Sequence, residues 1–402
     1  MKRTLRRPSG SPAVAARLVR GSRVLPAKAR ARPSNGARPG GSSAAGRLAR
    51  RRGLAASVGG AHAWVDLDRR RRELLPHLPR LAASRVRPPT QDNYLRALEE
   101  LRDFVLPRGC LAGGPLPAWE AHAWDQQLVA FIEKLYDDGR SRDTALRTLY
   151  GLCWGLPGLG RARAALPLAS SAIRGWGRLE PPHSRPPVPQ PVAYAIAGYL
   201  ASVGKASFGL AVVTMFECYL RASEIVDLRY FQIVEGIPSL EGVGARLSFI
   251  LSVAELQQPS KTNEVDSSVA LDLPRHGWLE WVWRRVKGSH RGAPSSKVFD
   301  FDYPQLLSEV KMAAEAVGAS VLGVTPHGMR HGGASHDRAT RARSLQEVQR
   351  RGFWRCDRSV QRYEKHARIG FEFQKLSAAA RRRVLELAER VPTLFVNCFA
   401  RR

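Results

Sequence analysis

Apolar positions repeat with a helical period from about residue 88 onward. Between residues 90 and 105 they fall on one side of a helix, at Tyr94, Leu95, Leu98, Leu101, Phe104 and Val105. Thr90 is expected to cap the start of this helix. The same period continues through residues 124–136 and 142–156, and it ends near Leu179. The pattern predicts a helical domain over residues 86–180.

A proline-rich segment interrupts the pattern after this domain. Residues 180–191 read EPPHSRPPVPQP, which cannot sustain a helix and tends to stay extended. We interpret residues 181–191 as a linker and residues 192–402 as a second domain.

The second domain combines helical and strand-like periods. Strands are predicted at residues 247–253 and 267–273, joined by a hairpin turn. Helices are predicted at residues 192–203, 205–220, 275–287, 304–317, 326–340, 344–351, 357–367 and 376–390. The chain is therefore predicted to be mainly α with a small antiparallel β-sheet.

The net charge of the chain indicates what kind of partner it binds. The chain has 402 residues, a formal net charge of +29 and a pI near 11.1. This balance favours a polyanionic partner, with nucleic acid first and an anionic membrane surface second. The longest apolar runs, such as residues 208–216, are far shorter than the ~20 residues of a membrane-spanning helix. No membrane partner is therefore expected.

Five cysteines are scattered along the chain and never spaced as CxxC, so the sequence signals neither a disulfide framework nor a zinc site. They are Cys110, Cys153, Cys218, Cys356 and Cys398.

The first 85 residues are predicted to be a disordered basic tail. Residues 1–65 contain 15 Lys or Arg and no acidic residue, and they offer little periodic apolar surface. The tail could be an arm that adds DNA affinity, an organellar transit peptide, or an extension without a function of its own.

Two cationic side chains stand in positions that favour phosphate chemistry. Arg221 follows an apolar helix and precedes a new Ser-initiated turn, where it could present a planar fork to a phosphate. Glu224, three residues later, could hold its guanidinium, and a surface ion pair is the alternative. Lys261 stands at the tip of the predicted hairpin, either as a solvated charge or as a general acid.

A third cluster begins the helix predicted at residues 326–340. Thr325 and Pro326 fit an N-cap and a first-turn proline. His327 and Arg330, three residues apart, are expected on one face of the first turn, where the helix N-terminus adds partial positive charge. His331 is expected off that face, as a packing residue or a donor behind the site.

The last cluster surrounds a tyrosine. Gly352 is expected to end one helix and Asp357 to cap the next, which carries Tyr363. Trp354 is interpreted either as a core residue or as an indole N–H donor to a phosphate oxygen. The surrounding cations fit a solvated helix face or a DNA backbone, and they are Arg355, Arg358, Arg362, Lys365 and Arg368.

Taken together, these pieces resemble the tyrosine recombinase, or phage integrase, family. The order that matches the family's catalytic set is Arg221, Lys261, His327, Arg330, Trp354 and Tyr363. The stretch from Met329 to His336, MRHGGASH, resembles the family's LRHxxAxH. Where the family usually has more apolar residues, this helix carries Gly332, Gly333, His336, Asp337 and Arg338, which predicts weaker packing.

The resemblance implies a helical, SAM-like core-binding domain, a mixed α+β catalytic domain and a mechanism on double-stranded DNA. A tyrosine hydroxyl, with a pKa of about 10, needs donors around the phosphorus it attacks. By resemblance Tyr363 is the nucleophile and Lys261 protonates the leaving 5′-oxygen, while the other set members stabilise charge. No cofactor or metal is implied. A homotetramer on DNA is implied, in which a C-terminal helix, here residues 376–390, docks on a neighbour.

Two other functions stay open from the residues. One is a domesticated DNA-binding protein without catalysis, and the other is a type IB topoisomerase-like enzyme, which shares the phosphotyrosyl chemistry. The expected compartment follows from the DNA partner: the nucleus in a eukaryote and otherwise the cytoplasm or nucleoid, with organellar targeting by the tail left open.

Overall fold

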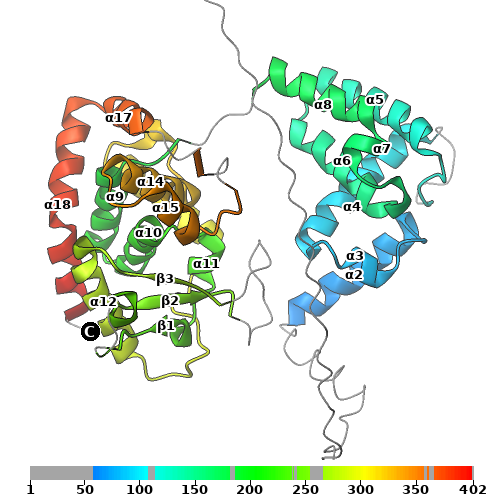
Figure 1. Cartoon of the computed structure of the whole chain (residues 1–402). Coiled ribbons are helices and arrows are strands. Elements are labelled where there is room, and N and C mark those ends of the chain that lie inside the picture. Colours follow the sequence, from blue (N-terminus) through cyan, green and yellow to red (C-terminus); the bar gives the residue numbers. More distant parts are fainter. Residues whose placement is uncertain are drawn as a thin grey trace, which may run out of the picture. The chain divides into compact units, whose positions relative to one another are not determined.

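The chain forms two compact units, residues 1–181 and residues 182–402 (Figure 1). The structure, a computed structural model, describes residues 58–106, 114–181, 186–237, 239, 242–253, 266–356, 360–361 and 366–400. The division falls at the start of the proline-rich segment 180–191. Most described residues are helical, and the three strands form one small antiparallel sheet, so the predicted fold class is confirmed.

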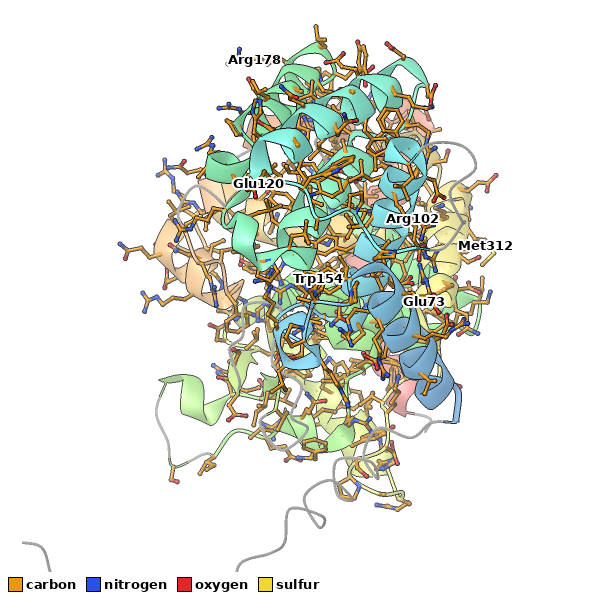
Figure 2. The ribbon with its side chains drawn as sticks, turned by 90° about the vertical axis from the view of Figure 1, so that its right-hand side faces the viewer. Glu73, Arg102, Glu120, Trp154, Arg178 and Met312 are labelled. Atoms are coloured by element: carbon orange, nitrogen blue, oxygen red, sulfur yellow. The ribbon has the colours of Figure 1, made fainter. Side chains whose placement is uncertain are left out.

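The described part of the first unit is made of helices. They are α2 (Val58–Leu74), α3 (Arg80–Ala83), α4 (Pro88–Val105), α5 (Ala121–Asp137), α6 (Arg142–Gly155), the 3-10 turn η1 (Pro157–Leu159), α7 (Ala162–Ala165) and α8 (Pro167–Leu179). Leu95, Leu98 and Leu101 recur at helical spacing and are buried. Figure 2 labels the buried Trp154 together with exposed side chains such as Arg178.

The helix predicted from Thr90 begins earlier than expected. Arg87 is its N-cap, and Pro88 occupies the first turn, where a missing N–H costs no hydrogen bond. Thr90 therefore lies inside α4 and does not cap it.

The prediction of a disordered tail through residue 85 is wrong for residues 58–85. These residues form α2 and α3, and Leu74, Leu75 and Leu78 are buried in the core of the first unit. Arg70 of α2 pairs with carboxylates of α4, at 2.7 Å and 2.8 Å from the Nη atoms. Burial of this short apolar run against other helices stabilises the ordered structure, although the local composition is polar. Residues 1–57 lie outside the described residues.

The second unit combines helices with one small sheet. Its elements are α9 (Gln190–Ser202), α10 (Ala206–Cys218), α11 (Ala222–Val226), η2 (Tyr230–Gln232), β1 (Ile233–Val234), η3 (Gly242–Ala245), β2 (Ser248–Leu251), β3 (Ser267–Ala270), η5 (Pro274–His276), α12 (Gly277–Ser289), α13 (Tyr303–Ala316), η6 (Ser320–Leu322), α14 (Pro326–Ala339), α15 (Leu345–Arg351), α17 (His366–Gln374) and α18 (Ala378–Ala400).

The sheet has the order β1-β2-β3 and every pairing is antiparallel. Leu251 pairs with Ser267, so the two predicted strands pair antiparallel as expected. Residues 254–265, which hold most of the predicted turn between them, lie outside the described residues. The short β1, which pairs Ile233 with Phe249, was not predicted because two residues carry no periodic signal.

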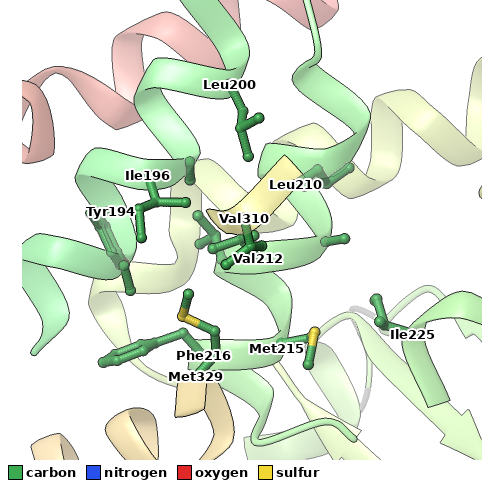
Figure 3. Close-up of a cluster of buried hydrophobic side chains, with 14 of the residues drawn as sticks. Tyr194, Ile196, Leu200, Leu210, Val212, Met215, Phe216, Ile225, Val310 and Met329 are labelled. Carbon is green, nitrogen blue, oxygen red and sulfur yellow. The ribbon is translucent and has the colours of Figure 1, made fainter. Parts of the chain in front are cut away.

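The core of this unit is built on α9 and α10, which are apolar around most of their circumference. Figure 3 shows Ile196 and Leu200 of α9 close to Leu210 and Val212 of α10. All four side chains are at most 1% exposed. A helix that is apolar on every side must be covered on every side, and α13, α14 and α18 cover this pair.

Glycines allow α14 to approach α10 closely. A Cβ on Gly333 would overlap the carbonyl oxygen of Phe216 in α10, and one on Gly332 would overlap the carbonyl oxygen of Val188. Met329 and Ala334 of α14 are fully buried as well. The prediction of weaker packing for this helix is wrong, because the small residues bring two backbones together instead of leaving a gap.

The C-terminal helix differs from its prediction in length and in what it contacts. Helix α18 continues past Arg390 to Ala400 with Pro392 inside it. Its apolar residues Val384, Val391, Phe395 and Phe399 are buried in the core of the same unit. The packing of these side chains outweighs the hydrogen bond lost at the proline. In this structure the apolar side chains of α18 pack on their own chain, and docking of residues 376–390 on a neighbouring subunit stays a prediction.

The glycine contact yields a stability test. Gly333→Ala should lower the free energy of unfolding by about 3 kcal/mol or more, because α14 must move away from α10 to admit the methyl group. Gly370→Ala, on an open position of α17, should instead raise it by roughly 0.5–1 kcal/mol through helix propensity. Urea unfolding of both variants checks this, and equal effects would contradict the close approach.

Candidate phosphate-binding site

Arg221 stands at the junction of α10 and α11. Helix α10 ends because Tyr219, its C-cap, takes left-handed backbone angles with φ 52°. Arg221 is then the N-cap of α11. One carboxylate oxygen of Glu224 accepts the Arg221 backbone N–H at 2.6 Å, and the other accepts the guanidinium. The pairing expected from the Arg-x-x-Glu spacing is present, and both side chains are largely buried.

Arg330 joins three segments of the second unit. Its two Nη groups donate to the backbone carbonyls of Tyr219 and Gly352. Its Nη1 atom also lies 3.9 Å from a carboxylate oxygen of Glu224, the partner of Arg221. The side chain is only 3% exposed. Arg221 and Arg330 are therefore brought together through one carboxylate, although they are more than one hundred residues apart in the sequence.

The start of α14 agrees with its sequence signals. The Thr325 hydroxyl accepts the backbone N–H of Gly328 at 3.4 Å, and Pro326 is the first helical residue. His327 and His331 are both half-buried. Their rings meet edge to face with centroids 4.7 Å apart. The expectation that His331 lies off the face of His327 is wrong, because residues four apart are neighbours on a helix.

Trp354 lies against the guanidinium of Arg330. The Arg330 Cζ atom is 4.7 Å from the centroid of the indole ring, within cation–π range. Helix α15 ends before Gly352 as predicted, but the left-handed residue is Phe353, with φ 51°. Gly352 is needed for space, since a Cβ there would overlap the Trp354 ring.

Only some of the remaining predicted site residues lie within the described part of the chain. Arg355 is exposed on the turn after Trp354, and Arg368 of α17 pairs with Glu372 at 2.6 Å. Lys261 and Tyr363, the general acid and the nucleophile of the sequence hypothesis, lie outside the described residues. So do Asp357, Arg358, Arg362 and Lys365.

A layer of buried charges behind the site was missed in the sequence. Asp337 of α14 accepts hydrogen bonds from Tyr219 and Arg275, and from Arg343 Nε at 3.0 Å. Glu217 of α10 accepts from Arg275 Nε at 3.0 Å. The available signal was spacing: Asp337 is seven residues, or two helical turns, after Arg330 and so falls on the same buried face.

These contacts shift the pKa values of the buried groups. Burial alone would raise the pKa of Glu217, but the hydrogen bond from His276 at 2.8 Å and the charge of Arg275 lower it to about 2. Burial, followed by the charge of Arg275, lowers the pKa of His336. Burial, together with the Asp337 carboxylate, raises the pKa of the Tyr219 hydroxyl well above its usual value. Glu217 therefore stays ionised and Tyr219 stays a hydrogen-bond donor near neutral pH.

Two further properties concern the described part of the chain. It holds no group of three or more His, Cys, Asp or Glu side chains that could bind a metal ion. None of its helices is both long enough and apolar enough to cross a lipid bilayer.

Comparison with known proteins finds similarity at the level of solved structures. No family model matches the chain, and no curated protein does. A lambda integrase dimer bound to a COC′ core site is similar with a TM-score of 0.47 and 15% identity, over 76% of this chain and 77% of that one. XerA recombinase is similar with a TM-score of 0.34 and 11% identity, over 73% of this chain and 94% of that one.

The buried carboxylate yields a pH test. The folded pKa of Glu217 lies below its ordinary value of 4.5, so its ionised form stabilises the fold above pH 4.5, and this contribution is lost as the pH falls toward 2. Glu217→Gln should therefore be less stable than the wild type at pH 7, by about 3 kcal/mol. The difference should shrink below pH 4.5. Urea unfolding at several pH values measures it, and a difference independent of pH would contradict the assignment.

Proposed function

We propose that this protein breaks and rejoins DNA strands by transesterification at Tyr363. The observation that carries the proposal is the pair of guanidinium groups, Arg221 and Arg330, that Glu224 brings together beside Trp354 and the start of α14. Two planar forks held side by side are suited to the non-bridging oxygens of a phosphate. The net charge of +29 supports a polyanionic partner of this kind.

The rigidity of the site supports catalysis rather than simple attraction. Transition-state charge is stabilised best by donors that do not reorganise during the reaction. Arg330 is fixed by two backbone carbonyls and by the Trp354 ring, and Arg221 is fixed by Glu224. A solvated surface arginine that only attracts DNA needs no such support.

The proposed reaction needs one nucleophile, one acid and one base. The Tyr363 oxygen attacks the scissile phosphorus, a P–O bond to the tyrosine forms, and the P–O5′ bond breaks. The products are a 3′-phosphotyrosyl link and a 5′-hydroxyl. Lys261 donates the proton that the leaving 5′-oxygen takes up, and His327 accepts the proton of the tyrosine. Attack by a 5′-hydroxyl from another duplex reverses the step and completes strand exchange.

We assign the partner as double-stranded DNA, with Arg355, Arg358, Arg362 and Lys365 contacting its backbone. A homotetramer on DNA remains part of the proposal. Because the apolar face of α18 is buried within its own unit, subunit contacts in such an assembly would have to come from other surfaces, or α18 would have to leave its present position.

The function is tested on DNA with a nick beside the scissile position. A library of nicked duplexes, with random sequence around the nick, traps any 3′-linked complex because the short 5′-hydroxyl fragment diffuses away. The wild type should yield a complex that survives denaturing electrophoresis, and Tyr363→Phe should yield none while keeping its affinity for DNA. Tyr303→Phe, a partly exposed tyrosine of the same unit, should behave as the wild type.

Other outcomes separate the alternatives. DNA binding without any covalent complex across the library would contradict the proposal and favour a DNA-binding protein without catalysis. A complex that forms equally well in Tyr363→Phe would assign the nucleophile to another residue. Relaxation of supercoiled plasmid by a monomer would favour a topoisomerase-like enzyme.

A further inference from the structure

We infer that Tyr219 is a positioning residue: it fixes the position of the Arg330 guanidinium and aligns this group with Arg221. Its effect on DNA cleavage rests on the proposed function, whereas its effect on Arg330 does not. Tyr219 lies two residues before Arg221, and its backbone carbonyl accepts a hydrogen bond from Arg330 Nη1. Any movement of its backbone would therefore move a contact of Arg330 and the chain leading into Arg221.

The backbone of Tyr219 is held in an unfavourable conformation. Its φ of 52° places it in the left-handed region, which crowds a Cβ against the backbone and is usual only for glycine. Such residues persist where the surrounding contacts determine them, and they cluster at functional sites. Here the cost is offset by the side chain, which is 1% exposed and packs beneath the guanidinium of Arg351, 5.4 Å from the ring centroid.

The hydroxyl of Tyr219 anchors this arrangement to α14. It donates to Asp337, which is fully buried and is itself held by Arg275 and Arg343. Arg330 and Asp337 are seven residues apart on the same helix, or about 10 Å along its axis. Tyr219 thus contacts α14 at two points, through its carbonyl at Arg330 and through its hydroxyl at Asp337. Two contacts so far apart fix both the sliding and the rotation of the α10–α11 junction against α14.

The second carbonyl that holds Arg330 stands at a similar turn. The Gly352 carbonyl accepts a hydrogen bond from Arg330 Nη2, and the next residue, Phe353, has φ 51°. These two carbonyl groups are therefore both positioned by left-handed turns that carry an aromatic residue. Tyr219 has a polar side chain that anchors its turn, and Phe353 does not. Removing the Tyr219 hydroxyl therefore tests how the turn positions Arg330.

Tyr219→Phe removes only the hydroxyl and keeps the ring. The matched control is Tyr194→Phe, which removes a buried hydroxyl that donates to Glu217 of α10 at 2.8 Å, whereas the Tyr219 hydroxyl donates to Asp337 of α14. Both variants lose one buried tyrosine–carboxylate hydrogen bond, so their melting temperatures should fall by similar amounts. The first readout is the rate at which phenylglyoxal modifies Arg330 in the full chain, followed by mass spectrometry of its peptide.

We expect Tyr219→Phe to raise the modification rate of Arg330 about fivefold to tenfold, the scale of one hydrogen bond, and Tyr194→Phe to leave it near the wild-type rate. The second readout is the single-turnover rate of covalent complex formation on the nicked duplexes. It should fall about tenfold or more in Tyr219→Phe alone, with DNA affinity unchanged within about twofold, because a misplaced donor costs rate more than binding.

Equal modification of Arg330 in the two variants would overturn the positioning role, whatever the DNA readout gives. Equal slowing of covalent complex formation in both would also overturn it, by assigning the effect to general loss of stability. If the wild type forms no covalent complex, the proposed function fails, and the modification of Arg330 still decides the positioning role by itself.

Discussion

The second unit depends on one buried cation. The guanidinium of Arg330 is almost inaccessible to solvent, and burying a charge is costly unless hydrogen bonds and nearby charges compensate it. Backbone carbonyls from two other segments, the Trp354 ring and the Glu224 carboxylate supply that compensation. The same contacts that make the charge tolerable fix where it points. The same contacts are therefore needed both for the stability of the fold and for the geometry of the site.

This arrangement is possible because two helices approach closely. Gly333 lets α14 lie against the backbone of α10, and Gly332 lets it lie against the Val188 carbonyl, which together place Arg330 within reach of the Tyr219 carbonyl. Behind the contact, Asp337 and Glu217 are held by arginines and by His276, so the carboxylates of this layer are buried together with hydrogen-bond donors. A rigid, charged layer beneath a cationic site keeps its donors from relaxing when a phosphate is absent.

Several local signals in the sequence predicted local structure correctly, although Thr90 does not cap α4 and His331 does not lie off the face of His327. The Thr325-Pro326 start of α14, the end of α15 before Gly352 and the pairing of Arg221 with Glu224 each depend on residues within one or two turns, so spacing was enough. Tertiary relations were predicted less well. No period in the sequence states that Tyr219 meets Asp337, or that two glycines admit a neighbouring backbone. The predictions for the end of α18 and for the leucines of residues 74–78 were wrong for the same reason. The residues that these side chains pack against are distant in sequence.

We propose that the arginine pair binds a phosphodiester that a tyrosine of this chain attacks. Proteolysis of the denatured protein–DNA complex, followed by nuclease digestion and mass spectrometry, identifies the residue that carries the nucleotide. We expect a nucleotide 3′-phosphate on the peptide that contains Tyr363. A nucleotide on a different residue, or DNA-bound protein that yields no modified peptide, would contradict it.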